Sequence, residues 1–465
     1  MDVRSIYFLL ILVLILAVLS TVQSLVDFLP GYSKKLPFKL ETGYVGVGLE
    51  DDLQLFYYFI ESEGNPKTDP LLLWLAGGPG CSGLSSLLYE IGPLAFDYTT
   101  YNEDLPSLLL NQYSWTKVAN IIFIDAPVGT GFSYSISGQG YSNINDAISA
   151  SQTCDFLKKW LTEHPKFLRN SVYIGGDDYS GMVVPLLLQE ILNGNEVKQE
   201  PRINLKGYLL GNPTTDEFED ANSVIPFSHR MSLISDEIYE SVKESCNGDY
   251  VHVDSGNTKC KLDLQIVTKC IKKILGAHIL EPNCNAFSSI RGNSLLRPSD
   301  FIFSRISTPS PDKFCREYNH LMADTWANDE AVQNALHVRE GTKKEWSRCN
   351  TSLDYTFDLQ STLNYHRNLT KKNLRVLIYS GDHDMVTPYL GTRTWIRSLN
   401  LTNINDWEPW LVDGQVAGYM EEYASKHSKF RLTFATLKGG GHTAPESMPK
   451  ECLAMVDRWF AYYPL

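Results

Sequence analysis

The chain has 465 residues, with 41 Lys and Arg against 54 Asp and Glu, and a formal net charge of -13. A surplus of negative charge repels phosphates and anionic headgroups, so we expect neither nucleic acid nor an anionic membrane as a partner. Hydrophobic residues make up 43% and charged residues 20% of the chain, which is ordinary for a globular protein. The length allows two or three domains, or one α/β core with insertions.

An apolar run near the start predicts a signal peptide over residues 1–24. The run from Ile6 to Leu19 follows Arg4, and small and polar residues lead on to Ser24. This is the layout of a secretory signal, and the run is short for a membrane span. We expect cleavage near Ser24, no membrane contact afterwards, and a secreted protein outside the cell or in the vacuole. A retained signal anchor is the alternative.

Apolar runs bounded by turn residues predict buried strands of a largely parallel sheet. They cover residues 71–76, 121–125, 171–175, 205–210, 376–380 and 432–436. Helical patterns such as 148–161 and 448–462 separate or follow these runs, so we predict an α/β fold with a mostly parallel central sheet. Ahead of them, residues 43–60 alternate in polarity, which predicts an antiparallel hairpin at the sheet edge.

A segment of different character interrupts the strand series. Residues 213–324 hold five of the nine cysteines and are typical of polar helices and loops without strong strands. We interpret them as a helical cap inserted between two parts of the core, residues 25–212 and 325–465. The odd number of cysteines leaves at least one unpaired, and no cysteine spacing is typical of a metal site. The chain has three sequons for N-glycosylation, at Asn350, Asn368 and Asn400.

The most informative motif is the hexapeptide at residues 176–181, Gly-Asp-Asp-Tyr-Ser-Gly. It follows a predicted strand and precedes a predicted helix, which is the context of a nucleophile elbow. An elbow lifts one side chain above the sheet. Here that side chain is the carboxylate of Asp178, where a hydroxyl is expected. An ordinary strand–helix turn is the other interpretation of the motif alone.

Two further loops follow predicted strands and carry an acid and a histidine. Asp384 lies four residues after the strand at 376–380, and His442 follows three glycines at residues 439–441. Alone, Asp384 also fits a turn or a helix N-cap, and His442 a plain loop residue. Together with the elbow they occur in the order nucleophile position, acid, histidine, which is the order of an α/β-hydrolase triad.

A glycine-rich loop supports the same interpretation. The segment 73–82 runs from a predicted strand into Ala-Gly-Gly-Pro-Gly-Cys-Ser, whose backbone can offer an N–H group to an oxyanion. Phosphate binding is the rival use of such a loop, but no P-loop lysine follows.

These motifs extend over nearly the whole mature chain. They comprise residues 40–44, 72–82, 125–134, 207–213, 332–337, 379–384 and 441–446. With them the chain resembles the plant members of the serine carboxypeptidase-like family, close to its acyltransferase-like branch. The resemblance implies an α/β-hydrolase fold with an inserted helical cap and no cofactor or metal.

The resemblance also assigns roles to single residues. It places the triad on Asp178, Asp384 and His442, and the oxyanion N–H groups on Gly78 and Tyr179. It further implies three disulfides, Cys81–Cys349, Cys246–Cys260 and Cys284–Cys315, with Cys154, Cys270 and Cys452 left free.

Substrate contacts are expected at Ala76, Gly77 and Asp177. In family peptidases an Asn and a Glu, at the positions of Ala76 and Asp177, hydrogen-bond the C-terminal carboxylate of the substrate. Because Ala cannot donate, this recognition should be weakened. A similar pair of changes marks acyltransferase-like members, which transfer acyl groups from 1-O-glucose esters. The expected partner is therefore a small acyl-glucose ester or a peptide.

Asp178 is a third position, after Ala76 and Asp177, at which the chain departs from the family: it stands where the family has its nucleophilic serine. A carboxylate attacking an acyl carbon would give a mixed anhydride, and two flanking carboxylates would hold His442 as imidazolium, which is no general base. Ser180 should point away from the elbow direction, about 200° further round a helix. We therefore expect a serine-type carboxypeptidase or acyltransferase by ancestry with impaired activity. The alternatives are a non-catalytic ligand-binding descendant and a hydrolase that uses Asp178 as its nucleophile on sp³ carbon.

Overall fold

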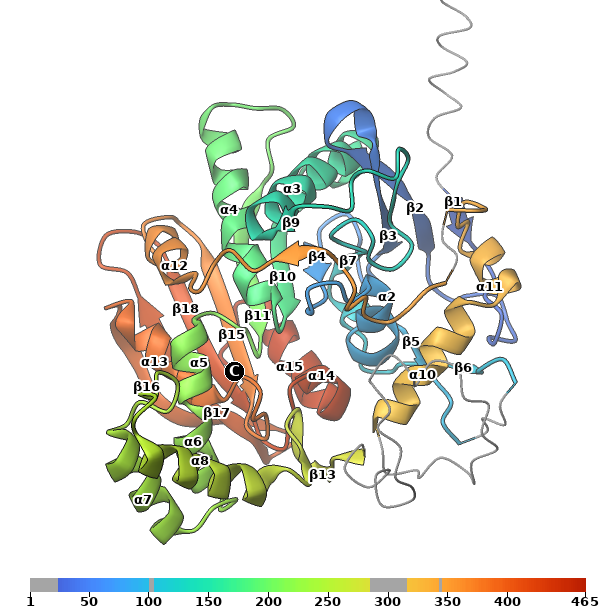
Figure 1. Ribbon diagram of the computed structural model, residues 1–465. Coiled ribbons are helices and arrows are strands. Elements are labelled where there is room, and N and C mark those ends of the chain that lie inside the picture. Colours follow the sequence, from blue (N-terminus) through green and yellow to red (C-terminus); the bar gives the residue numbers. More distant parts are fainter. Residues whose placement is uncertain (1–23, 100–103, 285–315, 343–344) are drawn as a thin grey trace, which may run out of the picture.

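The structure is a computed structural model that describes residues 24–99, 104–284, 316–342 and 345–465. The predicted signal peptide thus lies outside the described residues, except for Ser24. Among the residues described, we find no helix that is both long enough and apolar enough to span a membrane. A central sheet with helices on both of its faces organises the molecule (Figure 1).

In the described part of the chain, twelve strands form one sheet in the order β1-β2-β3-β7-β4-β10-β11-β15-β18-β17-β16, with β8 paired to β3. The strands are β1 (Ser24–Val26), β2 (Leu40–Val47), β3 (Leu53–Ile60), β4 (Leu71–Leu75), β7 (Asn120–Ile124), β8 (Tyr134–Ser135), β10 (Val172–Asp177), β11 (Leu205–Gly211), β15 (Arg375–Gly381), β16 (Thr402–Val412), β17 (Gln415–Ala424) and β18 (Arg431–Leu437). The stretch from β7 to β18 is parallel throughout, and antiparallel strands flank it on both sides. Its members are the six predicted buried strands, so the predicted fold class is confirmed.

The two ends of the sheet differ from the prediction. Residues 43–60 do form antiparallel strands, β2 and β3, but β3 is internal and all eight of its residues are buried. It also pairs with β7, and its alternate side chains enter the two hydrophobic clusters on opposite faces of the sheet, which explains the burial of both faces. The hairpin β16–β17 at the other end was not predicted, because exposed and polar residues interrupt its apolar pattern.

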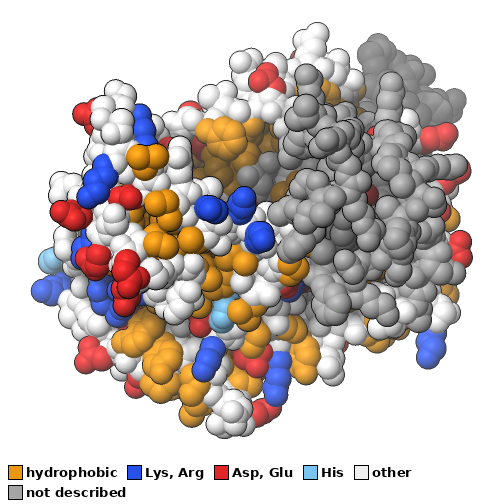
Figure 2. Space-filling view, turned by 60° about the horizontal axis from the view of Figure 1, so that its bottom comes forward, with side chains coloured by type: hydrophobic (Ala, Val, Ile, Leu, Met, Phe, Trp, Pro, Cys, Tyr) orange, Lys and Arg blue, Asp and Glu red, His pale blue; other side chains and the backbone are white. Residues whose placement is uncertain are grey.

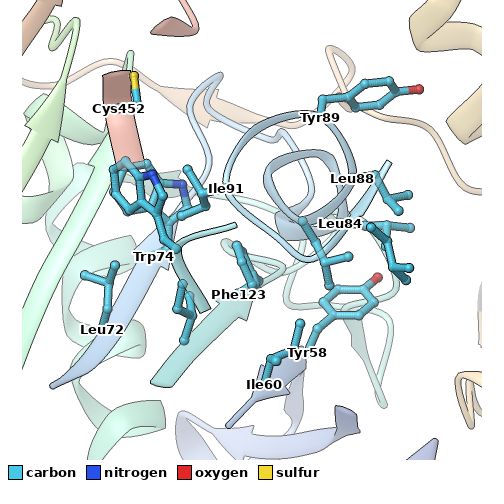
Figure 3. Close-up of a cluster of buried hydrophobic side chains, with 14 of the residues drawn as sticks. Tyr58, Ile60, Leu72, Trp74, Leu84, Leu88, Tyr89, Ile91, Phe123 and Cys452 are labelled. Atoms are coloured by element: carbon cyan, nitrogen blue, oxygen red, sulfur yellow. The ribbon is translucent and has the colours of Figure 1, made fainter. Parts of the chain in front are cut away.

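Side-chain alternation along the parallel strands builds a core on each face of the sheet. In β4, Leu72 and Trp74 join one cluster, whereas Leu71 and Leu73 join the other. Figure 3 shows Trp74 beside Leu72 and Phe123 in the first cluster.

Helices cover both clusters. The first cluster packs against α2 (Gly83–Ser85), η2 (Ser86–Glu90), α10 (Arg316–Ala327), α11 (Glu330–Ala335), α14 (Ala444–Ser447) and α15 (Pro449–Phe460). The second packs against α3 (Asp146–Glu163), α4 (Ser180–Glu196), α12 (Leu363–Leu369) and α13 (Tyr389–Ser398). Shorter elements are η1 (Leu49–Asp51), β5 (Leu94–Phe96), β6 (Leu108–Leu110), η3 (Trp115–Lys117), β9 (Ile144–Asn145), η4 (Pro165–Phe167) and β14 (Tyr355–Thr356).

The segment between β11 and α10 contains the predicted cap helices. They are α5 (Glu217–Asn222), α6 (Val224–Arg230), α7 (Asp236–Cys246) and α8 (Thr258–Ile271). No strong strands were expected in this segment, and the short hairpin of β12 (Ile274–Leu275) and β13 (His278–Pro282) follows the helices. The predicted cap boundary at residue 324 falls inside α10, whose Ala323 and Trp326 belong to the core cluster. The division into core and cap stays a prediction.

Two of the expected disulfides are present, Cys81–Cys349 and Cys246–Cys260. Cys154, Cys270 and Cys452 are free, as the resemblance implied. Cys315 lies outside the described residues, so the third expected pairing is not described here. Acidic and basic side chains are interspersed with apolar ones on the face shown in Figure 2.

Candidate functional site

A cavity of about 210 Å³ lies at the carboxyl end of the parallel strands, where open α/β sheets bind ligands. Its wall contains five of the predicted catalytic and substrate-binding residues, namely Ala76, Gly77, Asp177, Asp178 and His442. These residues come from three loops that are far apart in the sequence. The cavity is therefore the candidate site.

The elbow is a sharp turn between β10 and α4. Asp178 adopts φ +51°, a left-handed conformation that is strained for a residue with a side chain. Backbone hydrogen bonds from Asp178 N to Gly211 O (3.0 Å) and from Gly181 N to Asp178 O (3.1 Å) hold the turn. A Cβ on Gly77 would clash with the Asp178 carboxylate, so glycine is required there. The turn leaves the Asp178 side chain 26% exposed.

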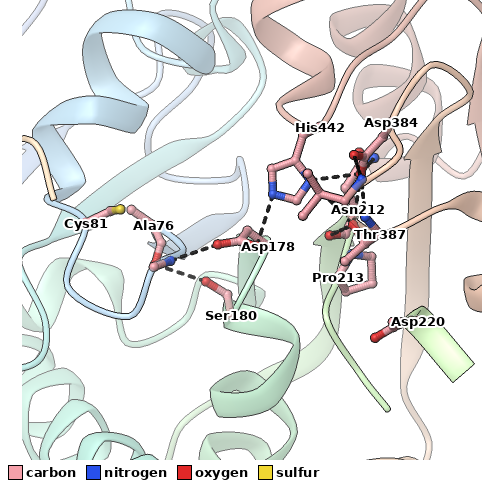
Figure 4. Close-up of polar contacts among 12 residues, drawn as sticks. Ala76, Cys81, Asp178, Ser180, Asn212, Pro213, Asp220, Asp384, Thr387 and His442 are labelled. Atoms are coloured by element: carbon pink, nitrogen blue, oxygen red, sulfur yellow. Dashed lines mark hydrogen bonds and ion pairs between the residues drawn. The ribbon is translucent and has the colours of Figure 1, made fainter. Parts of the chain in front are cut away.

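His442 lies between two carboxylates (Figure 4). Its Nε2 is 3.0 Å from Asp178 Oδ1, and its Nδ1 is 2.8 Å from Asp384 Oδ2. Ionised carboxylates only accept hydrogen bonds, so the ring must donate from both nitrogens, which requires the imidazolium form. The three residues named from the sequence are thus brought together.

A polar cage fixes the fully buried Asp384. Its Oδ2 accepts hydrogen bonds from Asn212 Nδ2 (2.9 Å) and from Thr387 Oγ1 (2.9 Å), and its Oδ1 accepts from Val386 N (2.7 Å). The sequence analysis did not single out Asn212 or Thr387. Asn212 does lie in the motif at residues 207–213, which was the available signal.

The hairpin β12–β13 contacts both loops that carry the acid and the histidine. His442 N donates to Ala277 O (2.6 Å), and Met385 N donates to Gly276 O (2.9 Å). Ile279 N in turn donates to the carbonyl oxygen of His383 (3.0 Å). These contacts were not predicted, because they use backbone groups and leave no mark on residue type.

The Asp178 carboxylate itself occupies the place expected for an oxyanion. Gly78 N donates to Asp178 Oδ2 at 2.9 Å, and the N–H of Tyr179 also lowers the pKa of this carboxyl group. Burial raises the pKa of Asp178, but His442 and these two N–H groups outweigh it and hold the pKa below its usual range. The carboxylate is therefore ionised at neutral pH, with both of its oxygens engaged.

The protonation of His442 follows from the same geometry. Burial lowers the pKa of its imidazole, but the charges and hydrogen bonds of Asp384 and Asp178 outweigh burial and raise the pKa well above the ordinary value. A general base needs a free lone pair on Nε2. Here Nε2 carries a proton that is directed at Asp178.

Ser180 is not directed into the cavity. It is 2% exposed, and its Oγ donates to the carbonyl oxygens of Leu75 (2.9 Å) and Ala76 (3.2 Å). These bonds tie the first turn of α4 to the glycine-rich loop. The expectation that Ser180 points away from the elbow direction agrees with this arrangement.

Charged residues that the sequence analysis did not assign complete the cavity wall. They are Glu90, Arg316, His320, Arg348 and Glu446, together with His278 from the hairpin. Arg316 bonds to Glu281 on β13 and to Glu446 beside the His442 loop. Only Glu446 lay in a motif noted from the sequence, the one at residues 441–446.

The pKa of the Asp177 carboxyl group is shifted in the opposite direction from that of its neighbour Asp178. Burial first, and then the charge of Asp178, raise the pKa of Asp177 to about 7, although His442 opposes this shift. Burial and the charge of Asp177 likewise raise the pKa of Glu90. The cavity wall thus holds two carboxyl groups with a lowered pKa, Asp178 and Glu446, beside two acids that keep their protons more strongly. Among the described residues, no group of His, Cys, Asp and Glu is placed to hold a metal ion.

Known proteins match this chain over nearly its full length. The family described as serine carboxypeptidase matches residues 30–462. Serine carboxypeptidase-like 10 of Arabidopsis thaliana is 49% identical over 457 residues, which cover 98% of this chain and 98% of that protein. Serine carboxypeptidase-like 7 of the same plant is 48% identical and covers 100% of this chain and 99% of that protein.

A solved structure agrees with these sequence relatives. Kex1(delta)p, a prohormone-processing carboxypeptidase from Saccharomyces cerevisiae, superposes with a TM-score of 0.73 at 19% identity, covering 94% of this chain and 95% of that one. At this identity the likeness concerns the fold alone, which is the α/β-hydrolase fold.

Proposed function

The chain belongs to the serine carboxypeptidase family, and from this premise we propose that it binds a family ligand without performing serine-type acyl chemistry. One observation supports this above all. The Asp178 carboxylate bridges His442 Nε2 (3.0 Å) and Gly78 N (2.9 Å), and so engages both the base and an oxyanion donor. An acyl substrate needs both groups free.

Chemistry at Asp178 gives the same result. Attack of a carboxylate on an acyl carbon forms a mixed anhydride in place of a stable acyl-enzyme ester. Loss of a triad nucleophile lowers kcat by about 10⁶-fold in a serine protease, and the remaining rate comes from the oxyanion hole and binding. In this chain the oxyanion donor is engaged as well. We therefore expect carboxypeptidase and acyltransferase activity to be absent or very low.

The ligand that we propose is a small acyl-glucose ester, with a peptide as the second choice. Ala76 lies on the cavity wall and has no side-chain donor for a peptide carboxylate. Passage through the secretory pathway is part of the proposal. It is supported by the apolar run at residues 6–19 and by the disulfides Cys81–Cys349 and Cys246–Cys260, since disulfides persist in oxidising compartments.

The test is the variant Asp178→Ser, with Asp178→Asn as its matched control. Each purified protein is treated with a fluorophosphonate and assayed with a panel of 1-O-acyl-glucose esters and blocked dipeptides. We expect a phosphonate adduct and at least about a 10²-fold gain in acyl release for Asp178→Ser only, because an oxyanion hole and base then act on a hydroxyl.

Two results would contradict the proposal. A phosphonate adduct on the unchanged protein would mean that a reactive hydroxyl survives. A folded Asp178→Ser variant without any gain would mean that the cavity has lost its ligand. Binding itself is measured on the unchanged protein by calorimetry, with the same esters and dipeptides as titrants.

A further inference from the structure

The contacts of Asp178 also suit a different reaction, which goes beyond ligand binding. A carboxylate attacking sp³ carbon forms a carboxylic ester, a stable intermediate, rather than an anhydride. The ester then needs an oxyanion donor at its carbonyl oxygen and a base for water. Both are already arranged around Asp178, which is 26% exposed on the cavity wall.

We propose that Asp178 is a nucleophile toward strained sp³ carbon, and that the site hydrolyses small epoxides through a covalent Asp178 ester. Two features of the carboxylate carry the proposal. Its Oδ2 accepts a hydrogen bond from Gly78 N at 2.9 Å, and its Oδ1 lies 3.0 Å from His442 Nε2, the one hydrogen-bond partner of Oδ1 among the described residues. A carboxylate oxygen has two lone-pair sites, so Oδ1 retains one for attack.

In the first step, Asp178 Oδ1 attacks one ring carbon of the epoxide. A new C–O bond forms, and the bond between that carbon and the ring oxygen breaks. The resulting alkoxide departs on the side opposite Oδ1, on the neighbouring carbon, and after rotation about the C–C bond it takes the Nε2 proton of His442. The products are a hydroxyalkyl ester on Asp178, in which Oδ2 is the carbonyl oxygen, and a neutral His442.

The second step uses the same groups in their new states. Asp178 is now uncharged, so only Asp384 still favours the imidazolium form of His442, and Nε2 is free to act as a base. It takes a proton from water while the oxygen of that water attacks the ester carbonyl carbon. The negative charge on Oδ2 meets the N–H of Gly78. Collapse of this tetrahedral intermediate breaks the bond between the carbonyl carbon and the alkyl oxygen. The released alkoxide takes the proton of the new carboxyl group, and the diol leaves.

Protonation of His442 has opposite consequences for the two chemistries. It removes the base that acyl transfer needs at the start. It also supplies the proton that the alkoxide takes once the ring has opened. The charge state that disables serine-type chemistry is thus the charge state in which this cycle begins and ends.

The test follows oxygen from isotopically labelled water into the protein. The unchanged protein is incubated in H₂¹⁸O with a limiting amount of 1,2-epoxybutane, digested, and analysed by mass spectrometry. We expect a transient adduct on the peptide that contains Asp178, and afterwards ¹⁸O in the Asp178 carboxyl group. The variant Asp178→Asn should show neither, while the exposed Asp406→Asn control should behave like the unchanged protein.

The proposal is overturned if Asp178 acquires no adduct and no ¹⁸O, or if it reacts no faster than exposed carboxylates such as Asp406. The variant Asp178→Asn is not essential, because the isotope readout is made on the unchanged protein. Failure here would leave the proposed ligand binding untouched, since that is judged by calorimetry and by the phosphonate reaction of Asp178→Ser.

Discussion

The disulfide between Cys81 and Cys349 fastens the loop that donates a hydrogen bond to Asp178, and its removal has a calculable effect. The bridge closes a loop with a sequence separation of 268, whereas Cys246–Cys260 closes one of 14. Loop-closure entropy gives upper limits of about 5.6 kcal/mol for the first bridge and about 3.0 kcal/mol for the second. For 465 residues these values correspond to a fall in Tm of about 6 °C and about 3 °C.

The assay is calorimetric melting of two double variants, Cys81→Ser/Cys349→Ser and Cys246→Ser/Cys260→Ser, under identical non-reducing conditions. The single variant Cys270→Ser is the control, because this cysteine is free and exposed, and its Tm should not change. The refuting result is an equal or larger loss of Tm in the Cys246/Cys260 pair. It would mean that local packing, rather than loop length, determines how much each disulfide stabilises the protein.

Three further predictions concern charge and modification. Asp178→Asn should lower the pKa of His442, because it removes one of the two negative charges beside the imidazole. NMR titration of the imidazole should detect this shift. No shift would mean that Asp384 alone keeps His442 protonated. The pKa of Asp177 is raised to about 7 in the folded protein, so at this residue the folded state binds more protons, and its contribution to the free energy of unfolding falls as pH rises from about 4 to about 7. Asp177→Asn should flatten this fall in denaturant titrations across that range, and an unchanged slope would refute it. Mass spectrometry of the protein expressed through a eukaryotic secretory pathway should find glycans at the two exposed sequons, Asn368 and Asn400. It should find none at the half-buried Asn350, whose Nδ2 donates to Gly129 O.

The parallel core could be predicted from the sequence because its strands are buried on both faces. Such strands are short continuous apolar runs, like residues 71–75, and turn residues mark their ends. The loops after them meet at one edge of the sheet. The convergence of Asp178, Asp384 and His442 therefore follows from their positions in the chain, provided that the strands pair as expected.

The rest of the site depends on contacts that residue type does not reveal. The cage around Asp384 uses Asn212 and Thr387, which are ordinary turn residues in the sequence. The hairpin acts through the carbonyl oxygens of Gly276 and Ala277, which any residue could supply. The edge strand at residues 402–412 could not be predicted, because many of its positions are exposed and half of the apolar pattern of a buried strand is missing.

The hydrogen bonds of the Asp178 side chain matter most for function, and the sequence predicted them in part. The motifs predicted an elbow and a His442 flanked by two carboxylates, but they did not predict that the Asp178 carboxylate would also bond to the oxyanion donor Gly78 N. In the structure it bonds to Gly78 N and to His442, groups that a substrate would otherwise satisfy. An unpaired buried donor costs about 1–3 kcal/mol, so the carboxylate stabilises the empty site. The substitution thus accounts both for an intact active-site geometry and for the loss of serine-type chemistry that we propose.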